Sequence, residues 1–253
     1  MKAMIFAAGL GTRLKPLTDS LPKALVPIGG KTLLQWQIEK LKSAGITDII
    51  INVHHFPDQI IDFVHAHDAF GCNIAISDER EMVLETGGGL RKALRDYAVN
   101  EPILALNVDI LSNIDIPAIL AAYRKNELGL LVVSQRQTQR YLSFDTEQRL
   151  TGWTNISTGD VRGKADGQLL AFSGMSLLSS RVRAYMDKVA QDKGDKFSLI
   201  DLYLDIVTNQ QPAVNCQQPE DTTLRAFIPD NYRMMDVGKI DQLSTAETFA
   251  QSL

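Results

Sequence analysis

The sequence has few of the residues and runs that mark secreted, membrane or thiolate-metal proteins. It contains only two cysteines, Cys72 and Cys216, which have no C-x-x-C or other ligand spacing. We expect them to be reduced, small hydrophobic residues of a cytoplasmic protein. No apolar run reaches the ~18 residues that a membrane span needs, and no signal-peptide pattern is visible at the N-terminus. The expectation is a soluble cytoplasmic protein with no membrane partner.

An excess of positive charge and a metal-binding histidine pattern are also missing. The formal net charge is -4 over 253 residues, which argues against a general nucleic-acid binder. Among the four histidines, His65 and His67 are two positions apart on an expected helix and therefore point to different faces. No thiolate or carboxylate stands at ligand spacing, so a zinc site is not expected. Any bound anion must then be held by a few well-placed cations.

Apolar runs and helical spacing alternate through the first half of the chain. The expected strands in that half are residues 2–7, 48–53, 73–77, 102–107 and 128–134. The expected helices are residues 31–44, 57–67, 86–97 and 116–125. This alternation predicts an α/β fold with a doubly wound, mostly parallel (mixed) Rossmann-like sheet and helices on both faces. Ligands of such sheets bind at the carboxyl ends of the strands, near the switch point.

The second half is less regular. Residues 144–154, 169–178, 224–228 and 232–235 resemble strands, and residues 182–190, 199–207 and 240–249 resemble helices. We find no repeat, low-complexity tract or linker, so we expect one domain over residues 1–253, long enough to bury a full core.

A glycine-bent loop at the end of the first expected strand is the strongest motif. It is Gly9-Leu10-Gly11-Thr12-Arg13-Leu14-Lys15-Pro16-Leu17-Thr18, and Pro22-Lys23-Ala24-Leu25 follows. Two glycines let the backbone turn tightly and approach a bulky group. Exposed amides from Ala8 to Thr12, together with the cations, suit a polyphosphate.

Two other phosphate-binding motifs match only in part. A dinucleotide fingerprint needs a third glycine where Leu14 stands, Pro16 interrupts its helix, and the second expected strand ends in Asn52 rather than an acid. The triplet Gly30-Lys31-Thr32 could end a Walker A loop, but Leu25 replaces the required earlier glycine. A turn that opens a helix is the favoured interpretation of the triplet.

The loop and the Pro22–Leu25 motif resemble the G-x-G-T/S-R-L/M-x-P-L-T and P-K-P/A-L/M signature of the sugar-1-phosphate nucleotidyltransferases. Later elements match in order, so the resemblance covers nearly the whole chain. It implies a nucleotide-binding half (residues 1–134) and a sugar-binding half (residues 135–253). It also implies that Arg13 contacts the departing pyrophosphate and Lys23 the α-phosphate. The nucleotide-binding residues that it implies in this first half of the site are Ala8, Gly9, Leu10, Gly11, Thr12, Arg13 and Lys23.

Two aspartates match the metal ligands of the family. Asp109, in Asn107-Val108-Asp109, stands where the family has N/G-G-D, with Val108 replacing the usual glycine. Asp236, in Met235-Asp236-Val237-Gly238, matches the second aspartate. The resemblance therefore implies Mg²⁺ on Asp109 and Asp236, since Mg²⁺ prefers oxygen ligands. The catalytic set that it implies is Arg13, Lys23 and Asp109.

Base and sugar contacts are implied by two further elements. Leu84-Glu85-Thr86-Gly87-Gly88-Gly89 corresponds to the family's L-G-T-A-G loop, which implies that Glu85, Thr86, Gly87 and Gly88 meet the nucleotide. Its glutamate resembles the N-acetylmuramate-1-phosphate uridylyltransferase branch. Phe172-Ser173-Gly174-Met175-Ser176 matches a strand under the sugar. The sugar-binding residues implied are Asn107, Asn155, Ser173 and Gly174.

The resemblance implies nucleotidyl transfer from an NTP to a sugar 1-phosphate, with UTP and N-acetylmuramate 1-phosphate favoured. A mannose- or heptose-1-phosphate guanylyltransferase and a choline-phosphate cytidylyltransferase stay open as alternatives. So does a non-catalytic regulatory subunit, although such proteins often lose the arginine, the lysine or the metal aspartates, and all four are present here. The sequence predicts no oligomeric state.

Overall fold

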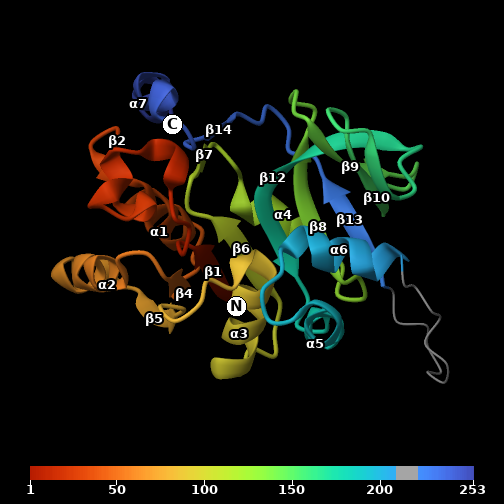
Figure 1. The fold of residues 1–253 in the computed structure, drawn as a ribbon, viewed down its shortest axis with the longest axis horizontal. Helices are drawn as coiled ribbons and strands as arrows, with labels where there is room; N and C mark the ends of the chain where they lie inside the picture. Colours follow the sequence, from red (N-terminus) through yellow and green to blue (C-terminus); the bar gives the residue numbers. More distant parts are fainter. Residues whose placement is uncertain (209–221) are drawn as a thin grey trace.

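The computed structural model describes residues 1–208 and 222–253 (Figure 1), so Cys216 lies outside the described residues. In this part of the chain, ten strands form one mixed sheet in the order β11-β10-β9-β12-β6-β1-β4-β5, with β8 beside β12 and β13 beside β8. The strands are β1 (Lys2–Phe6), β4 (Asp48–Val53), β5 (Asn73–Asp78), β6 (Ile103–Asn107), β8 (Gly129–Ser134), β9 (Arg140–Phe144), β10 (Leu150–Asn155), β11 (Asp160–Gly163), β12 (Gln168–Leu178) and β13 (Leu224–Phe227).

The first half supplies the parallel part of the sheet. Strands β6, β1, β4 and β5 are parallel neighbours, and Met4 of β1 lies between Ala105 and Ile50. The long strand β12 runs antiparallel to β6, β8 and β9 and joins the two halves, while β13 lies parallel to β8. The predicted mixed, doubly wound sheet is confirmed.

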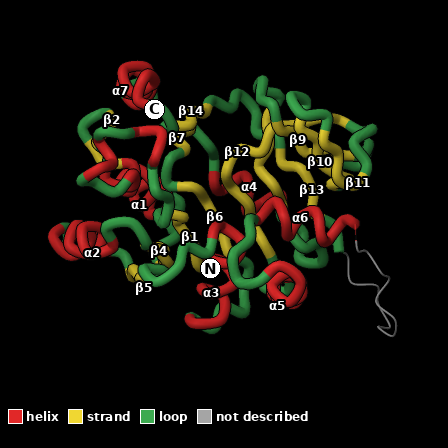
Figure 2. The backbone as a smooth tube through the Cα atoms, viewed as in Figure 1, coloured by secondary structure: helices red, strands yellow, loops and turns green. Residues whose placement is uncertain are grey.

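Helices cover both faces of this sheet (Figure 2). They are α1 (Leu33–Ser43), α2 (Pro57–Ala66), α3 (Glu85–Asp96), α4 (Ile116–Ala122), α5 (Val182–Lys193), α6 (Leu199–Thr208) and α7 (Leu243–Ala250). One buried cluster joins α1, α2, α4 and α7 to the side of β1 that carries Ala3 and Ile5. The other joins α3, α5 and α6 to the side that carries Met4 and Phe6. Both faces of β1 are buried, which is why its sequence is a continuous apolar run.

Local signals explain where several elements begin. Thr32 is the N-cap of α1, and its hydroxyl accepts a hydrogen bond from the Gln35 amide at 3.1 Å. The interpretation of Gly30-Lys31-Thr32 as a helix start is therefore confirmed. No helix among the described residues is long and apolar enough to cross a membrane.

The expected strand over residues 144–154 is confirmed only in part, because a turn divides it. Strand β9 ends at Phe144, and β10 begins at Leu150 after a turn in which the Asp145 carboxylate accepts from the amides of Glu147 and Arg149. A side chain that accepts hydrogen bonds from the backbone amides that follow it favours a turn. Strand β11 was also missed because all four of its residues are exposed, so it has no alternating apolar pattern.

Two small sheets complete the fold. Strands β2 (Pro27–Ile28) and β3 (Lys31–Thr32) pair with each other, and β7 (Ile110–Ser112) pairs with β14 (Met234–Asp236). The second pair places Asp236 opposite Ile110, and Ile110 is the residue that follows Asp109 in the sequence. This short ladder brings the C-terminal part of the chain to the end of β6.

Candidate functional site

A cavity of about 490 Å³ lies at the carboxyl ends of β1, β4 and β6. Its lining includes many of the residues predicted from the sequence: Ala8, Gly9, Leu10, Gly11, Thr12, Arg13, Lys23, Glu85, Thr86, Asn107 and Asp109. Residues widely separated in the sequence thus meet where a doubly wound sheet binds its ligands.

The turn of the glycine loop at Gly11 is fixed by hydrogen bonds within the loop. Gly11 has a φ of +64°, and a Cβ added there would lie 2.8 Å from Thr18 Cγ2, so glycine is required at this turn. The Gly11 carbonyl accepts from the Leu14 amide and from the Thr18 hydroxyl, each at 2.8 Å. By contrast, a Cβ at Gly9 would meet nothing within 4 Å. The loop is therefore anchored on the Gly11 side and open on the Gly9 side.

Two cations and two carboxylates gather beside this loop. Lys23 is buried and forms an ion pair with Asp109. A Cβ added at Gly238 would lie 2.8 Å from Asp236 Oδ1 and 3.1 Å from Arg13 Nη2, so glycine lets these two charged groups approach. The Val237 amide donates to the Asp109 carbonyl at 2.9 Å, which fixes the two aspartates as neighbours.

The electrostatics of Asp236 reflect this crowding. Asp236 is an exposed residue, yet partial loss of solvation around its carboxyl raises its pKa, and the charge of Asp109 raises the pKa further. Lys23 and Arg13 act in the opposite direction. A bound cation would relieve the effect of the Asp109 charge on the Asp236 carboxyl.

Asn107 lines the cavity, and Gly174 lies next to Asn107 without being part of the lining. Gly174 has a φ of +72° within an irregular part of β12, and a Cβ there would lie 3.0 Å from Asn107 Nδ2. Ser173, its neighbour, is buried at 1% exposure and does not line the cavity.

Asn155 lies elsewhere, at the end of β10. Its side-chain oxygen accepts from the amide and the hydroxyl of Ser157, at 3.1 and 2.8 Å, in the turn to β11. It does not line the cavity.

The glycine-rich start of α3 contacts the protein rather than the cavity. The amides of Gly87 and Gly88 both donate to the Phe197 carbonyl, at 2.9 and 3.0 Å. A Cβ at Gly88 would lie 2.0 Å from the Asp195 carbonyl oxygen. These glycines make room for residues 195–198, and only Glu85 and Thr86 of this loop face the cavity.

The N-terminal part of the chain decides the family. Residues 2–147 match the family model described as nucleotidyl transferase. This chain belongs to the nucleotidyl transferase family. The motifs at residues 9–18, 22–25 and 107–109 all fall within the matched region.

Two relatives of this chain share one name with each other. It is 46% identical over 118 residues to the N-acetylmuramate alpha-1-phosphate uridylyltransferase of Neisseria meningitidis serogroup B, covering 47% of this chain and 51% of that one. It is 34% identical over 171 residues to the protein of that name from Caulobacter vibrioides, covering 65% of each chain. The chain thus spans between half and two thirds of the length of these relatives.

The fold likeness extends over the whole nucleotidyl transferase chain. A putative glucose-1-phosphate thymidylyltransferase from Bacillus anthracis superposes with a TM-score of 0.79 at 19% identity, covering 100% of this chain and 96% of that one. At this identity the likeness concerns the fold, and it includes the irregular second half.

Several lining residues of this nucleotidyl transferase escaped the sequence motifs. They include Asn52, Val83 and Ser198. Ser198 reaches the cavity because the Leu199 amide donates to Thr86 Oγ1 at 3.0 Å, which docks residues 195–199 on the start of α3. The signal available in the sequence was the run Gly87–Gly89 itself, because glycines that start a helix indicate a close backbone neighbour.

Proposed function

We propose that this protein transfers the uridylyl group of UTP to N-acetylmuramate 1-phosphate, giving a UDP-sugar and pyrophosphate. The observation that carries the proposal is the convergence of Arg13, Lys23 and Asp109 on one cavity, with Glu85 and Thr86 on its wall. The choice of base and sugar is supported by the two relatives named above.

The chemistry needs alignment and charge neutralisation more than proton transfer. An oxygen of the sugar phosphate attacks the α-phosphorus, the bond to the bridging oxygen breaks, and pyrophosphate leaves with the electron pair. The attacking phosphate is already an anion at neutral pH, because its second pKa is about 6. No general base is required, and catalysis then rests on positioning and electrostatics.

The proposed roles follow from where each group lies. Residues Ala8 to Thr12 line the cavity, and we propose that their amides cradle the β- and γ-phosphates. Arg13 offers a planar fork of donors to the leaving pyrophosphate. Lys23, now paired with Asp109, supplies a positive charge beside the α-phosphate.

The donor set fits Mg²⁺. Asp109 and Asp236 are neighbouring carboxylates, and the pKa of Asp236 is raised by desolvation and then by the charge of Asp109. No group of three or more histidine, cysteine, aspartate or glutamate ligands exists among the described residues, so phosphate oxygens would complete the coordination. We infer that Asp109 and Asp236 hold the ion, which when bound would neutralise charge on the phosphates.

The sugar side of the proposal rests on Asn107, on Gly174 and on the buried Ser173 next to Gly174. Asn107 lines the cavity, and Gly174 leaves the space next to the Asn107 amide free of a side chain. Asn155 is not included, because its amide oxygen is bonded within the turn after β10. We propose one domain in which residues 1–134 bind the nucleotide and residues 135–253 the sugar.

The test is pyrophosphate release with Mg²⁺ over a grid of substrates. The grid crosses UTP, GTP, CTP and ATP with the 1-phosphates of N-acetylmuramate, N-acetylglucosamine and mannose, and with choline phosphate. We expect turnover with UTP and N-acetylmuramate 1-phosphate. Turnover only with GTP and mannose 1-phosphate, or only with CTP and choline phosphate, would overturn the substrates but keep the reaction class. No turnover with any pair would favour a regulatory nucleotide-binding protein.

A further inference from the structure

A buried hydrogen-bonded pair, Asn52 and Glu79, joins two walls of the cavity. The Ala7 amide donates to Asn52 Oδ1 at 2.8 Å, and Asn52 Nδ2 donates to Glu79 Oε1 at 2.8 Å. The Leu84 amide donates to Glu79 Oε2 at 3.1 Å. One continuous path therefore runs from the loop after β1, across the ends of β4 and β5, to the loop before α3.

Burying this polar pair carries a desolvation penalty that two apolar side chains would not carry. Asn52 is 2% exposed and Glu79 is 3% exposed. Burial raises the pKa of Glu79, and its two hydrogen bonds offset part of that effect. Buried charged groups are often replaceable by apolar side chains without loss of stability, so stability alone does not account for this one.

Gly89 packs directly against the Asn52–Glu79 pair. A Cβ at Gly89 would lie 2.7 Å from Glu79 Oε1 and 3.0 Å from Asn52 Nδ2. The third glycine of the Gly87–Gly89 run thus leaves space for the pair, whereas Gly87 and Gly88 leave space for residues 195–198.

We propose that Asn52 and Glu79 are positioning residues that set the spacing between the phosphate loop (residues 7–13) and the base loop (residues 84–86), and thereby the affinity for the NTP. The proposal rests on the function proposed above. Asn52 lines the cavity, but its side-chain oxygen accepts a hydrogen bond from the Ala7 amide. Glu79 does not line the cavity and acts through its contacts with Asn52 and Leu84.

The hydrogen-bond directions supply a sharp test. In Asn52→Asp, a carboxylate oxygen of residue 52 faces a carboxylate oxygen of Glu79, so the bond between them is lost. In Glu79→Gln, the new NH₂ group faces another donor, either Asn52 Nδ2 or the Leu84 amide, so one bond is lost. In the double variant N52D/E79Q the central bond reverses, and all three bonds are satisfied again at the same charge and nearly the same volume. Each single variant should weaken UTP binding about tenfold or more, and the double variant should recover to within about threefold of the wild type.

The measurement is calorimetric titration with Mg-UTP, together with the KM for each substrate and kcat. The matched control is the Asn73–Asp48 pair, in which Asn73 Nδ2 donates to Asp48 Oδ1 at 2.7 Å at the opposite ends of the same two strands. We expect Asn73→Asp to leave UTP affinity unchanged. Gly89→Ala, which pushes on the pair without changing its charge, should also weaken UTP binding, and thermal unfolding of each variant reports whether it is folded.

The outcomes separate the possibilities. Weaker UTP binding in the single variants, an unchanged KM for the sugar phosphate, and recovery in the double variant support the inference. Unchanged UTP affinity in the single variants, or a double variant as weak as they are, overturns it while leaving the proposed function intact. If the wild type binds no NTP at all, the proposed function fails and the inference fails with it.

Discussion

At the scale of single residues, the ammonium of Lys23 is the group on which the proposed chemistry depends most. It is buried beside Asp109, and an adjacent phosphate would share its charge. We expect Lys23→Ala to lower kcat for pyrophosphate release by about 10²–10³, by analogy with the loss of one donor to a developing anion.

The control for this variant lies in the same region of the chain. Lys15 is exposed, pairs with Asp19 at 2.9 Å and does not line the cavity. Lys15→Ala should keep kcat within about twofold of the wild type, since exposed pairs contribute little. A Lys23→Ala enzyme with near-normal kcat, or an equal loss in Lys15→Ala, would remove Lys23 from the mechanism.

Individual site residues could be predicted where the sequence places them in an ordered motif. Arg13, Lys23 and Asp109 meet at one cavity as the motifs indicate. Ser198 could not be predicted in this way, because it reaches the cavity through contacts between residues 195–199 and the start of α3. Such a contact depends on tertiary packing and leaves no local spacing to recognise.

Lys40 gives a second prediction at this scale, on stability against pH. It donates to Ser112 Oγ at 3.1 Å, and burial lowers its pKa to about 8 from the usual 10.5. Between these two pH values the unfolded chain binds the proton and the folded chain does not, so the free energy of unfolding rises with pH. Below pH 8 the folded chain carries a charged, partly desolvated Lys40 that lowers stability, and this penalty fades as the pH rises from about 8 to 10.5.

The measurement compares wild type with Lys40→Met in urea at several values between pH 7 and pH 10. The stability of the wild type relative to Lys40→Met should increase over this range by about 3 kcal/mol at most. Lys42→Met, which changes an exposed lysine of the same helix, is the control. Parallel pH curves for wild type and Lys40→Met would contradict the prediction.

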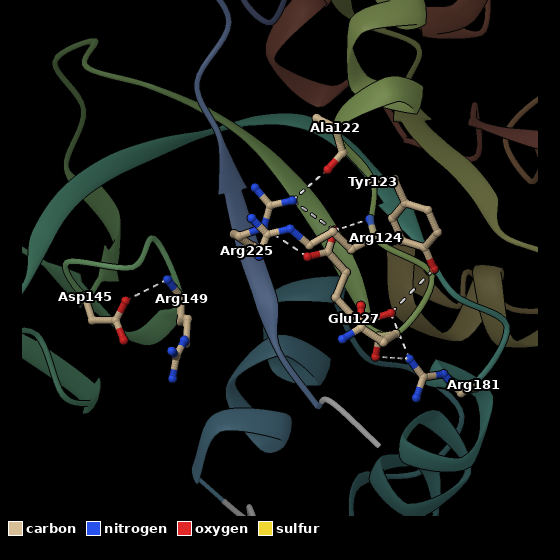
Figure 3. A network of polar contacts seen from close by, with 9 residues as sticks. Ala122, Tyr123, Arg124, Glu127, Asp145, Arg149, Arg181 and Arg225 are labelled. Atoms are coloured by element: carbon tan, nitrogen blue, oxygen red, sulfur yellow. Dashed lines mark hydrogen bonds and ion pairs between the residues drawn. The ribbon is translucent and has the colours of Figure 1, made fainter. Parts of the chain in front are cut away.

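At the scale of elements, a buried ion pair ties α4, β8 and β13 together (Figure 3). Glu127 accepts from Arg225 Nε at 2.9 Å and from the Arg124 amide at 2.9 Å, and Arg225 Nη2 donates to the Ala122 carbonyl at 2.7 Å. The side chains of Glu127 and Arg225 are 1% and 13% exposed. The pair fixes the turn after α4 against the strand that lies parallel to β8.

We expect Glu127→Gln to lower the free energy of unfolding by about 3–5 kcal/mol, because Arg225 is left buried without its counter-charge. The matched control is Glu147→Gln, which breaks the exposed pair of Glu147 with Arg149 and should change stability by less than about 1 kcal/mol. Urea unfolding measures both. Equal effects of the two substitutions would show that burial of the Glu127–Arg225 pair has no energetic consequence.

Element prediction succeeded where local pattern and tertiary role coincide. Strands β1, β4 and β6 are apolar runs because both of their faces are buried. The glycines at the start of α3 show the opposite case. The resemblance implies that Gly87 and Gly88 meet the nucleotide, and the structure places both of them against residues 195–198 and outside the cavity lining. A glycine run indicates a close neighbour without indicating which one.

At the scale of the whole molecule, β12 makes one sheet out of two differently built halves. The first half alternates strand and helix, which predicts a parallel sheet. The second half adds β9, β10 and β11 in antiparallel order through tight turns. This extension has exposed, polar positions in β11, so hydrophobic periodicity could not define its strands. Both halves nonetheless place residues at the end of β6, where Asn107 meets Gly174.

Because both halves border the site, a bound nucleotide should stabilise the whole chain. A ligand that binds only the folded state at 100 times its Kd adds about 2.7 kcal/mol, which for a chain of this size corresponds to a Tm increase of about 5–10 °C. We expect UTP with Mg²⁺ to produce such a shift and EDTA to remove most of it, because the triphosphate would then face Asp109 and Asp236 without a cation between them. GTP at the same concentration should produce a smaller shift.

Asp236→Asn separates the metal contribution from the fold. The raised pKa of Asp236 means that its ionised form is disfavoured in the folded chain, so at pH 7 its removal should leave the unliganded Tm equal or higher. The Mg²⁺-dependent part of the UTP shift should nevertheless fall, because one of two proposed ligands is gone. Differential scanning fluorimetry with and without EDTA measures both quantities. If Asp236→Asn keeps the full Mg²⁺-dependent shift, Asp236 is not a ligand of the ion. The role of Asp236 would then be its interaction with Arg13, which lies near it beside Gly238.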